Sequence, residues 1–97
     1  MTKEQVIEVL GKHLAEIRHR FAVQRLSLFG SVARDEAGLG SDVDLLVVFE
    51  GKPTFDAFMD LKFYLEDVLG GTVDLVTDKA MRPQVRQAIS GELVDVA

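Results

Sequence analysis

The fold of this chain can be inferred outward from two short runs, LFGSVAR at residues 28–34 and SDVDLLVV at residues 41–48. The first run predicts an apolar strand that breaks at Gly30 into a short helix ending near residue 37. The second predicts a buried strand over residues 43–49. The glycines within residues 38–41 mark the connection as a loop. A glycine and a hydroxyl group therefore stand where a helix begins, and two aspartates stand where the next strand begins.

These polar residues indicate a site for a nucleotide and a metal ion. Free N–H groups and the positive dipole end at a helix start attract phosphate, so Gly30 and Ser31 can contact one. Asp42 and Asp44 are two residues apart, so in a strand both side chains point to one face, about 7 Å apart along the backbone. Carboxylates placed in this way suit Mg²⁺, which takes substrate phosphates as its remaining ligands.

A third carboxylate, Asp74, interrupts an apolar strand predicted over residues 72–77. An aspartate in such a strand is costly to bury unless it is paired or bound to a metal. Two interpretations stay open: Asp74 faces solvent and has no role, or its strand neighbours that of Asp44 and the three aspartates share one site. In the second case they would bind two metal ions for an in-line phosphoryl transfer, and Asp74 would receive or orient the proton of the acceptor.

Arg34 and Ser41 complete the candidate set. Arg34 follows Ser31 by three residues and so lies on the same side of the short helix, where its guanidinium can bind phosphate oxygens. The alternative for Arg34 is an exposed ion pair with Asp35 or Glu36, which would contribute little. Ser41 directly precedes Asp42 and is either a nucleotide-binding residue or a turn residue.

The helices on either side predict an α/β class with a small mixed sheet flanked by helices. Thr2 begins a capping box, and the apolar stripe that follows predicts one long amphipathic helix ending near Phe21. A second long helix follows Thr54 and ends at Gly70. A last helix begins near Pro83. Its apolar residues are expected to face inward: Val85, Ala88 and Ile89.

Length and composition limit the alternatives. The chain has 97 residues, which predicts a single domain over residues 1–97. It contains no cysteine, no apolar run near the ~20 residues of a membrane span, and no secretory signal at its start. We therefore expect a cytoplasmic protein without membrane association. A net charge of −5 argues against general nucleic-acid binding, which needs a basic surface.

Taken together, these residues resemble a known family. Gly30-Ser31, followed after ten residues by Asp42-x-Asp44, is similar to the signature of the nucleotidyltransferase superfamily with the DNA polymerase beta catalytic fold. The longer pattern, including the third aspartate in VDLV at residues 73–76, resembles the minimal nucleotidyltransferases, which include MntA-like antitoxins. The resemblance covers nearly the whole chain. One departure is Asp35, where the family commonly has glycine.

This resemblance implies a polymerase-beta-like fold and a Mg²⁺-dependent transfer of AMP from ATP to a hydroxyl group, with two Mg²⁺ ions. Within the family, the MntA-like proteins modify a tyrosine of a helical HepT-like toxin, and a chain without a second domain is expected to need such a partner. Two alternatives stay open. The chain can be a non-catalytic antitoxin or subunit that neutralises a helical partner by contact, or a nucleotidyltransferase acting on a small molecule.

Overall fold

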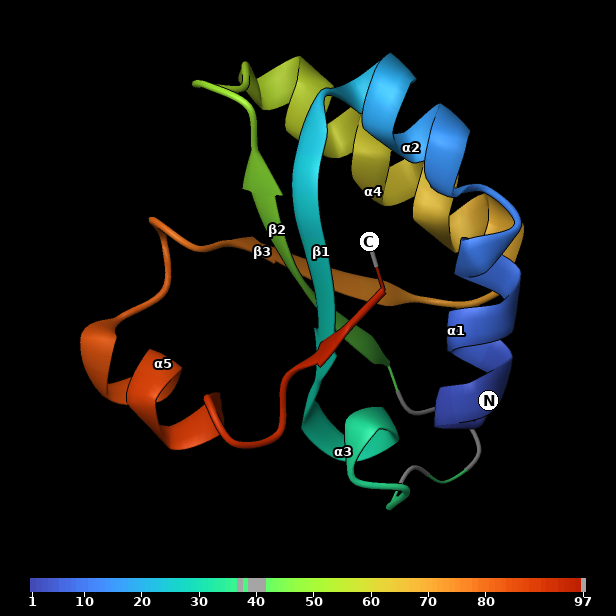
Figure 1. The fold of residues 1–97 in the computed structure, drawn as a ribbon, viewed down its shortest axis with the longest axis vertical. Helices are drawn as coiled ribbons and strands as arrows, with labels where there is room; N and C mark the ends of the chain where they lie inside the picture. Colours follow the sequence, from blue (N-terminus) through green and yellow to red (C-terminus); the bar gives the residue numbers. More distant parts are fainter. Residues whose placement is uncertain (37, 39–41, 97) are drawn as a thin grey trace.

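The computed structural model of the chain describes residues 1–36, 38 and 42–96. Helices and strands are interspersed along these residues, which confirms the predicted α/β class (Figure 1). None of the helices in these ranges is long and apolar enough to cross a membrane. In chain order the elements are α1 (Lys3–Gly11), α2 (Leu14–Phe21), β1 (Val23–Phe29), α3 (Gly30–Ala33), β2 (Val43–Phe49), α4 (Phe55–Leu69), β3 (Val73–Thr77), α5 (Pro83–Ile89) and β4 (Val94–Asp95).

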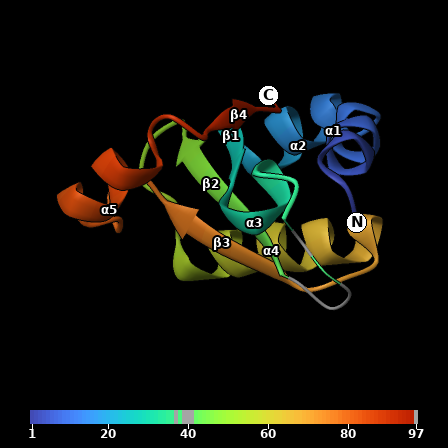
Figure 2. The same cartoon turned by 90° about the horizontal axis from the view of Figure 1, so that it is seen from below.

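The four strands form one mixed sheet in the order β3-β2-β1-β4. Strands β2 and β3 are parallel, whereas β1 is antiparallel to both β2 and β4. Helices α1, α2 and α4 cover one face of the sheet, and α5 lies apart on the other side (Figures 1 and 2). Because β1 and β2 are antiparallel, the end of β1 lies beside the start of β2, where Phe29 is opposite Asp44. The polar residues at these strand ends therefore share one end of the sheet.

The core lies between this sheet and its three covering helices. Its fully buried side chains come from every covering helix and from the two central strands, and include Val6, Leu10, Ile17, Leu26, Leu28, Leu45, Val47, Leu61 and Leu65. Three consecutive residues of β2, from Leu45 to Val47, are buried. Successive side chains of a strand point to opposite faces, so the centre of β2 is covered on both faces, as predicted.

The prediction of a single first helix from the apolar stripe is wrong. The structure has two helices, α1 and α2, separated at Lys12 and His13. Gly11, a weak helix former, ends α1, and the N–H of His13 donates to the carbonyl of Leu10 at 3.0 Å in a tighter turn. Both helices still bury the predicted side, through Val6 and Leu10 in α1 and through Ile17 and Phe21 in α2.

Helix α3 is shorter than predicted because the backbone reverses after Arg34. Asp35 adopts a φ of 57°, in the left-handed region that glycine occupies most easily. Asp35 lies 3.6 Å from the Nζ of Lys3, so its carboxylate also connects this turn to α1.

The expectation that α5 faces inward is also wrong. No residue of α5 is buried: Val85 is 45% exposed, Ala88 is exposed and Ile89 is only partly covered. The apolar spacing that predicts a helix does not determine whether another element packs against it. Pro83 does begin the helix, as predicted.

Ala22 offers a test of backbone strain at the end of α2. It follows the helix at a φ of 52°, a left-handed conformation that costs an L-residue about 1 kcal/mol more than it costs glycine. We expect Ala22→Gly to raise the free energy of unfolding by about 0.5–1 kcal/mol, measured by urea denaturation. Ala15→Gly, the same change in the first turn of α2, should lower it by about 0.5 kcal/mol. A loss of stability in Ala22→Gly would show that the left-handed conformation of Ala22 is not strained.

Candidate functional site

Two of the three predicted aspartates lie side by side. Strands β2 and β3 are parallel and in register, so Asp44 is the direct partner of Asp74. Burial raises the pKa of Asp44 above its ordinary value, and the negative charges of Asp74 and Asp42 raise it further, with Arg34 opposing them. Asp74 is solvent-exposed and Asp44 is partly buried. Asp74 is thus exposed, as the first interpretation expects, and its strand neighbours that of Asp44, as the second expects. A role for Asp74 stays a prediction.

Asp42 stands just before β2 and is exposed. Its charge acts on Asp44, but within the described ranges no three acidic or histidine side chains form a ready-made metal site. The described structure brings Asp44 and Asp74 together, and a metal site that they share with Asp42 stays a prediction. Mg²⁺ is usually bound by one or two carboxylates together with substrate phosphates, so the oxygen donors present fit an ion that arrives with a nucleotide.

The turn from β1 into α3 packs closely against Asp44. Gly30 has a φ of 75°, and a Cβ at this position would overlap the Oδ2 of Asp44 and lie 2.9 Å from its Cγ. Only glycine therefore fits between the strand end and the carboxylate. Ser31 follows at the start of α3, partly exposed, so the candidate phosphate-binding turn and the aspartate pair adjoin each other. Ser41 lies outside the described residues.

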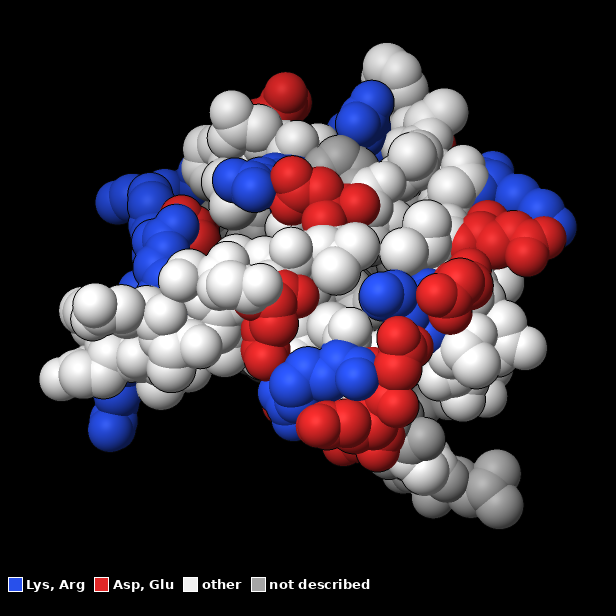
Figure 3. Space-filling model, turned by 60° about the horizontal axis from the view of Figure 1, so that its bottom comes forward, with Lys and Arg blue, Asp and Glu red and all other residues white. Residues whose placement is uncertain are grey.

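Arg34 is already engaged in the structure. Its Nε donates to Glu36 at 2.8 Å, and its Nη1 donates to the two carboxylate oxygens of Glu92 at 3.0 and 3.2 Å. The ion pair with Glu36, one of the two alternatives for this residue, is therefore present. Binding of a phosphate by Arg34 stays a prediction. Acidic and basic side chains alternate over the face of the molecule that carries α3 (Figure 3).

Glu92 is a residue of this region that sequence reasoning missed. Its Oε1 accepts the backbone N–H of Gly30 at 3.0 Å and also binds Arg34. Hydrogen bonds from Arg34 and from the Gly30 N–H lower the pKa of Glu92 below its ordinary value. No local pattern marks Glu92, because its partners lie 58 and 62 residues away along the chain.

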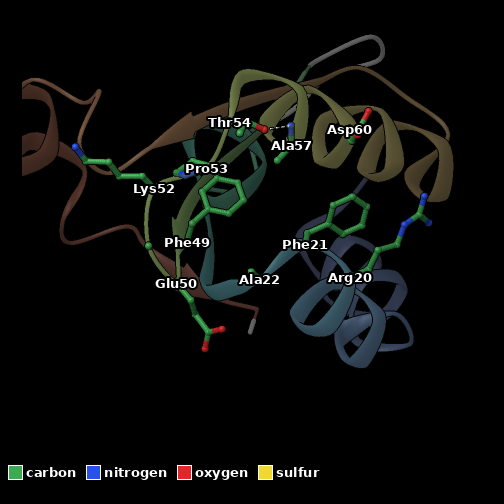
Figure 4. A pocket seen from close by; sticks show the side chains of 11 residues that line it. Arg20, Phe21, Ala22, Phe49, Glu50, Lys52, Pro53, Thr54, Ala57 and Asp60 are labelled. Atoms are coloured by element: carbon green, nitrogen blue, oxygen red, sulfur yellow. Dashed lines mark hydrogen bonds between the residues drawn. The ribbon is translucent and has the colours of Figure 1, made fainter.

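A pocket of about 390 Å³ lies at the opposite end of β2 (Figure 4). Phe21 at the end of α2, Phe49 at the end of β2 and Thr54 at the start of α4 contribute to its lining. None of the candidate residues lines it. The candidate site is therefore distinct from this pocket and is placed by the aspartates and the Gly30 turn.

The raised pKa of Asp44 predicts how stability depends on pH. Because the carboxyl is harder to ionise in the folded state, stability is lost as the pH rises from the ordinary value of 3.8 through the higher folded value. Without divalent metal, the stability advantage of Asp44→Asn over the wild type should therefore grow over this range and then level off. Urea denaturation of both proteins between pH 3.5 and about 7 measures it. A pH-independent difference would contradict the assignment.

Comparison with known proteins gives consistent matches. A family described as the nucleotidyltransferase domain matches residues 10–96. The protein adenylyltransferase MntA of Thermococcus cleftensis is 40% identical over 99% of this chain and 97% of its own length. A solved structure of a minimal nucleotidyltransferase is 35% identical, with a TM-score of 0.81, over 97% of this chain and 95% of that one. A toxin–antitoxin structure with AMP-PNP shares the fold at 20% identity and a TM-score of 0.74. The match covers 90% of this chain and 72% of that one.

Proposed function

Because this chain belongs to the nucleotidyltransferase family, we propose that it uses Mg²⁺ to transfer AMP from ATP to a hydroxyl group of a partner protein. The observation that supports this most is the direct pairing of Asp44 with Asp74 across β2 and β3, beside a turn where only glycine fits. Two such carboxylates repel each other when both are ionised, and a bound cation would relieve that repulsion. The aspartate pair at this end of the sheet therefore favours a metal-dependent reaction.

Each proposed role follows from where a side chain lies. Asp42 and Asp44, with Asp74, would hold Mg²⁺, which supplies positive charge to the phosphate oxygens. Gly30 and Ser31 would bind the phosphates through the backbone and the Ser31 hydroxyl, because they begin α3 next to Asp44. Asp74 is the exposed member of the pair, so an acceptor from solvent can reach it.

The proposed reaction forms one bond and breaks one bond. The acceptor oxygen attacks the α-phosphorus of ATP, a new O–P bond forms, and the bond between the α-phosphorus and the bridging oxygen breaks. Pyrophosphate leaves with that electron pair, and the acceptor's proton passes to Asp74. The exposed carboxylate of Asp74 suits this role because it can contact both solvent and Asp44.

The proposed acceptor is a tyrosine of a HepT-like helical toxin, which this chain would silence as an antitoxin. Support comes from the relative of Thermococcus cleftensis, whose name is protein adenylyltransferase, and from the shared fold with a toxin–antitoxin structure. Because ATP is the proposed donor, we place the reaction in the cytoplasm.

Intact-mass measurement tests this proposal. The purified chain is incubated with ATP, Mg²⁺ and the product of the neighbouring gene. We expect the partner to gain one or more adenylyl units, located on tyrosine by peptide sequencing. The double variant Asp42→Asn/Asp44→Asn should give none. An unmodified partner in a tight complex would support neutralisation by contact instead, and turnover of a small hydroxyl compound without any partner would support a small-molecule transferase.

Asp74→Asn separates binding from proton transfer. Because Asp42 and Asp44 remain to hold Mg²⁺, this variant should bind Mg²⁺–ATP within about twofold of the wild type. Because it lacks the group that accepts the acceptor's proton, it should transfer AMP about 10²–10⁴-fold more slowly. Isothermal titration calorimetry gives the binding constant and single-turnover mass spectrometry gives the rate. Equal losses in binding and rate would remove the assignment of Asp74 to proton transfer.

A further inference from the structure

The turn that begins α3 is held from the far end of the chain. The carboxylate of Glu92 accepts the backbone N–H of Gly30 at 3.0 Å and receives two hydrogen bonds from the Nη1 of Arg34. Its side chain is 19% exposed, whereas that of Arg34 is 45% exposed. Glu92 therefore lies between the turn and Arg34, in the segment that leads into β4.

This arrangement decides what Arg34 can do. Glu36 and Glu92 together carry more negative charge than one guanidinium neutralises, and they take its Nε and Nη1. A phosphate approaching Arg34 would meet both carboxylates, which weakens direct attraction. The contacts are better explained if Arg34 fixes the Glu92 carboxylate, because a charge-assisted pair with two hydrogen bonds has a defined geometry.

The Gly30 turn needs such support. Its φ of 75° and its close approach to Asp44 leave little freedom for movement, yet α3 has only four residues and few hydrogen bonds of its own. A shift of about 1 Å in a substrate-positioning group can reduce a rate 10²-fold. An acceptor for the Gly30 N–H, supplied from outside the turn, limits that shift.

We propose that Glu92, held by Arg34, is a positioning residue that fixes the Gly30–Ser31 turn against Asp44 so that the turn can bind the phosphates of ATP. The inference rests on the proposed function, and it assigns Arg34 to the same support. Glu92 acts through the turn, so its loss changes ATP binding more than the chemical step.

Asp95 provides a matched control. It lies three residues after Glu92 and also connects the C-terminal segment to β1, by accepting hydrogen bonds from Arg25 at 3.0 and 3.1 Å and from Ser27 at 2.7 Å. It has no contact with the Gly30 turn in the described structure. Asp95→Asn therefore disturbs attachment of the same segment without touching the turn.

Steady-state kinetics of the two variants test the proposal. We expect Glu92→Ala to raise the KM for ATP about tenfold to a hundredfold, the loss typical when partners that orient a ligand-binding group are removed, with a smaller change in kcat. Asp95→Asn should leave both constants within about twofold of the wild type. Glu92→Gln keeps an acceptor for the Gly30 N–H and should fall between wild type and Glu92→Ala, which also covers the case in which the alanine variant folds poorly.

A double-variant cycle tests the link to Arg34. If Arg34 acts through Glu92, Arg34→Ala/Glu92→Ala should be no worse than Glu92→Ala alone, whereas independent phosphate contacts would give the product of the two losses. Unchanged kinetics in Glu92→Ala, equal losses in Asp95→Asn, or multiplying losses in the cycle would each overturn the proposal.

Amide NMR separates this inference from the proposed function. In the nucleotide-free protein, the Gly30 amide proton should move upfield in Glu92→Ala and stay in place in Asp95→Asn. If the wild type transfers no AMP, the proposed function fails, and Mg²⁺–ATP binding then tests Glu92 by itself. An unchanged dissociation constant in Glu92→Ala would overturn the positioning role.

Discussion

Replacing Asp44 with asparagine should remove nearly all AMP transfer while making the nucleotide-free protein slightly more stable. Asp44 is the most central carboxylate, paired with Asp74 and packed against Gly30. Its loss removes a ligand of the Mg²⁺ that would supply several kcal/mol of transition-state charge stabilisation, so we expect a decrease of about 10³-fold in the single-turnover rate. Without metal, removing one of two like charges directly opposite each other should stabilise the fold by about 0.5 kcal/mol.

Because the transfer rate should fall while the stability rises, the experiment distinguishes loss of a metal ligand from damage to the fold. A variant that merely damages the fold would lose rate and stability together. Asp60→Asn on α4 removes the same charge at the opposite end of β2, where the exposed Asp60 lines the pocket beside Phe49, and should change neither quantity measurably. Transfer at near wild-type rate in Asp44→Asn would exclude this carboxylate as a metal ligand.

Gly30→Ala should be the most damaging glycine-to-alanine substitution among the glycines that the structure describes. The new Cβ would overlap the Oδ2 of Asp44, and the φ of 75° would be strained in any L-residue. Left-handed strain of roughly 1–2 kcal/mol and overpacking of roughly 1–3 kcal/mol together predict a loss of about 2–5 kcal/mol in the free energy of unfolding. We expect kcat/KM to fall by at least about 10²-fold, because the turn and Asp44 must move apart.

Gly11→Ala is the control for this change. Gly11 ends α1 and does not have a positive φ, and a Cβ added there would meet no neighbouring side chain or element within 4 Å. The same substitution there should raise stability by about 0.5 kcal/mol and leave the kinetics unchanged. Urea denaturation and transfer assays on both variants give the comparison. Wild-type stability in Gly30→Ala would show that the turn can relax without cost.

The pairing of strands explains why the aspartates were predictable only in part. Alternation along a strand places Asp42 and Asp44 on one side, but the partner of Asp44 depends on which strand lies next to β2 and in which register. The structure sets β3 beside β2 with Asp74 opposite Asp44. A shift of one residue would have turned Asp74 to the other face, and no local signal excludes that shift.

Features that local chemistry controls were predictable from the sequence. Thr2 begins α1 with the predicted capping box, Thr54 caps α4, and Gly70 ends α4 at a φ of 72°. These features depend on hydrogen bonds and steric limits that act within about four residues, so a short window of sequence contains everything needed to predict them.

Which faces are covered, and which distant groups meet, depends on how whole helices and strands pack together. This packing left α5 exposed in spite of its apolar spacing, paired Asp44 with Asp74, and placed Glu92 between Gly30 and Arg34. The contacts of Glu92 join residues 58 and 62 positions apart. Such contacts result from the packing of whole helices and strands, whose free energy is distributed over the core. The residues next to Glu92 in the sequence therefore contain no pattern that predicts its contacts.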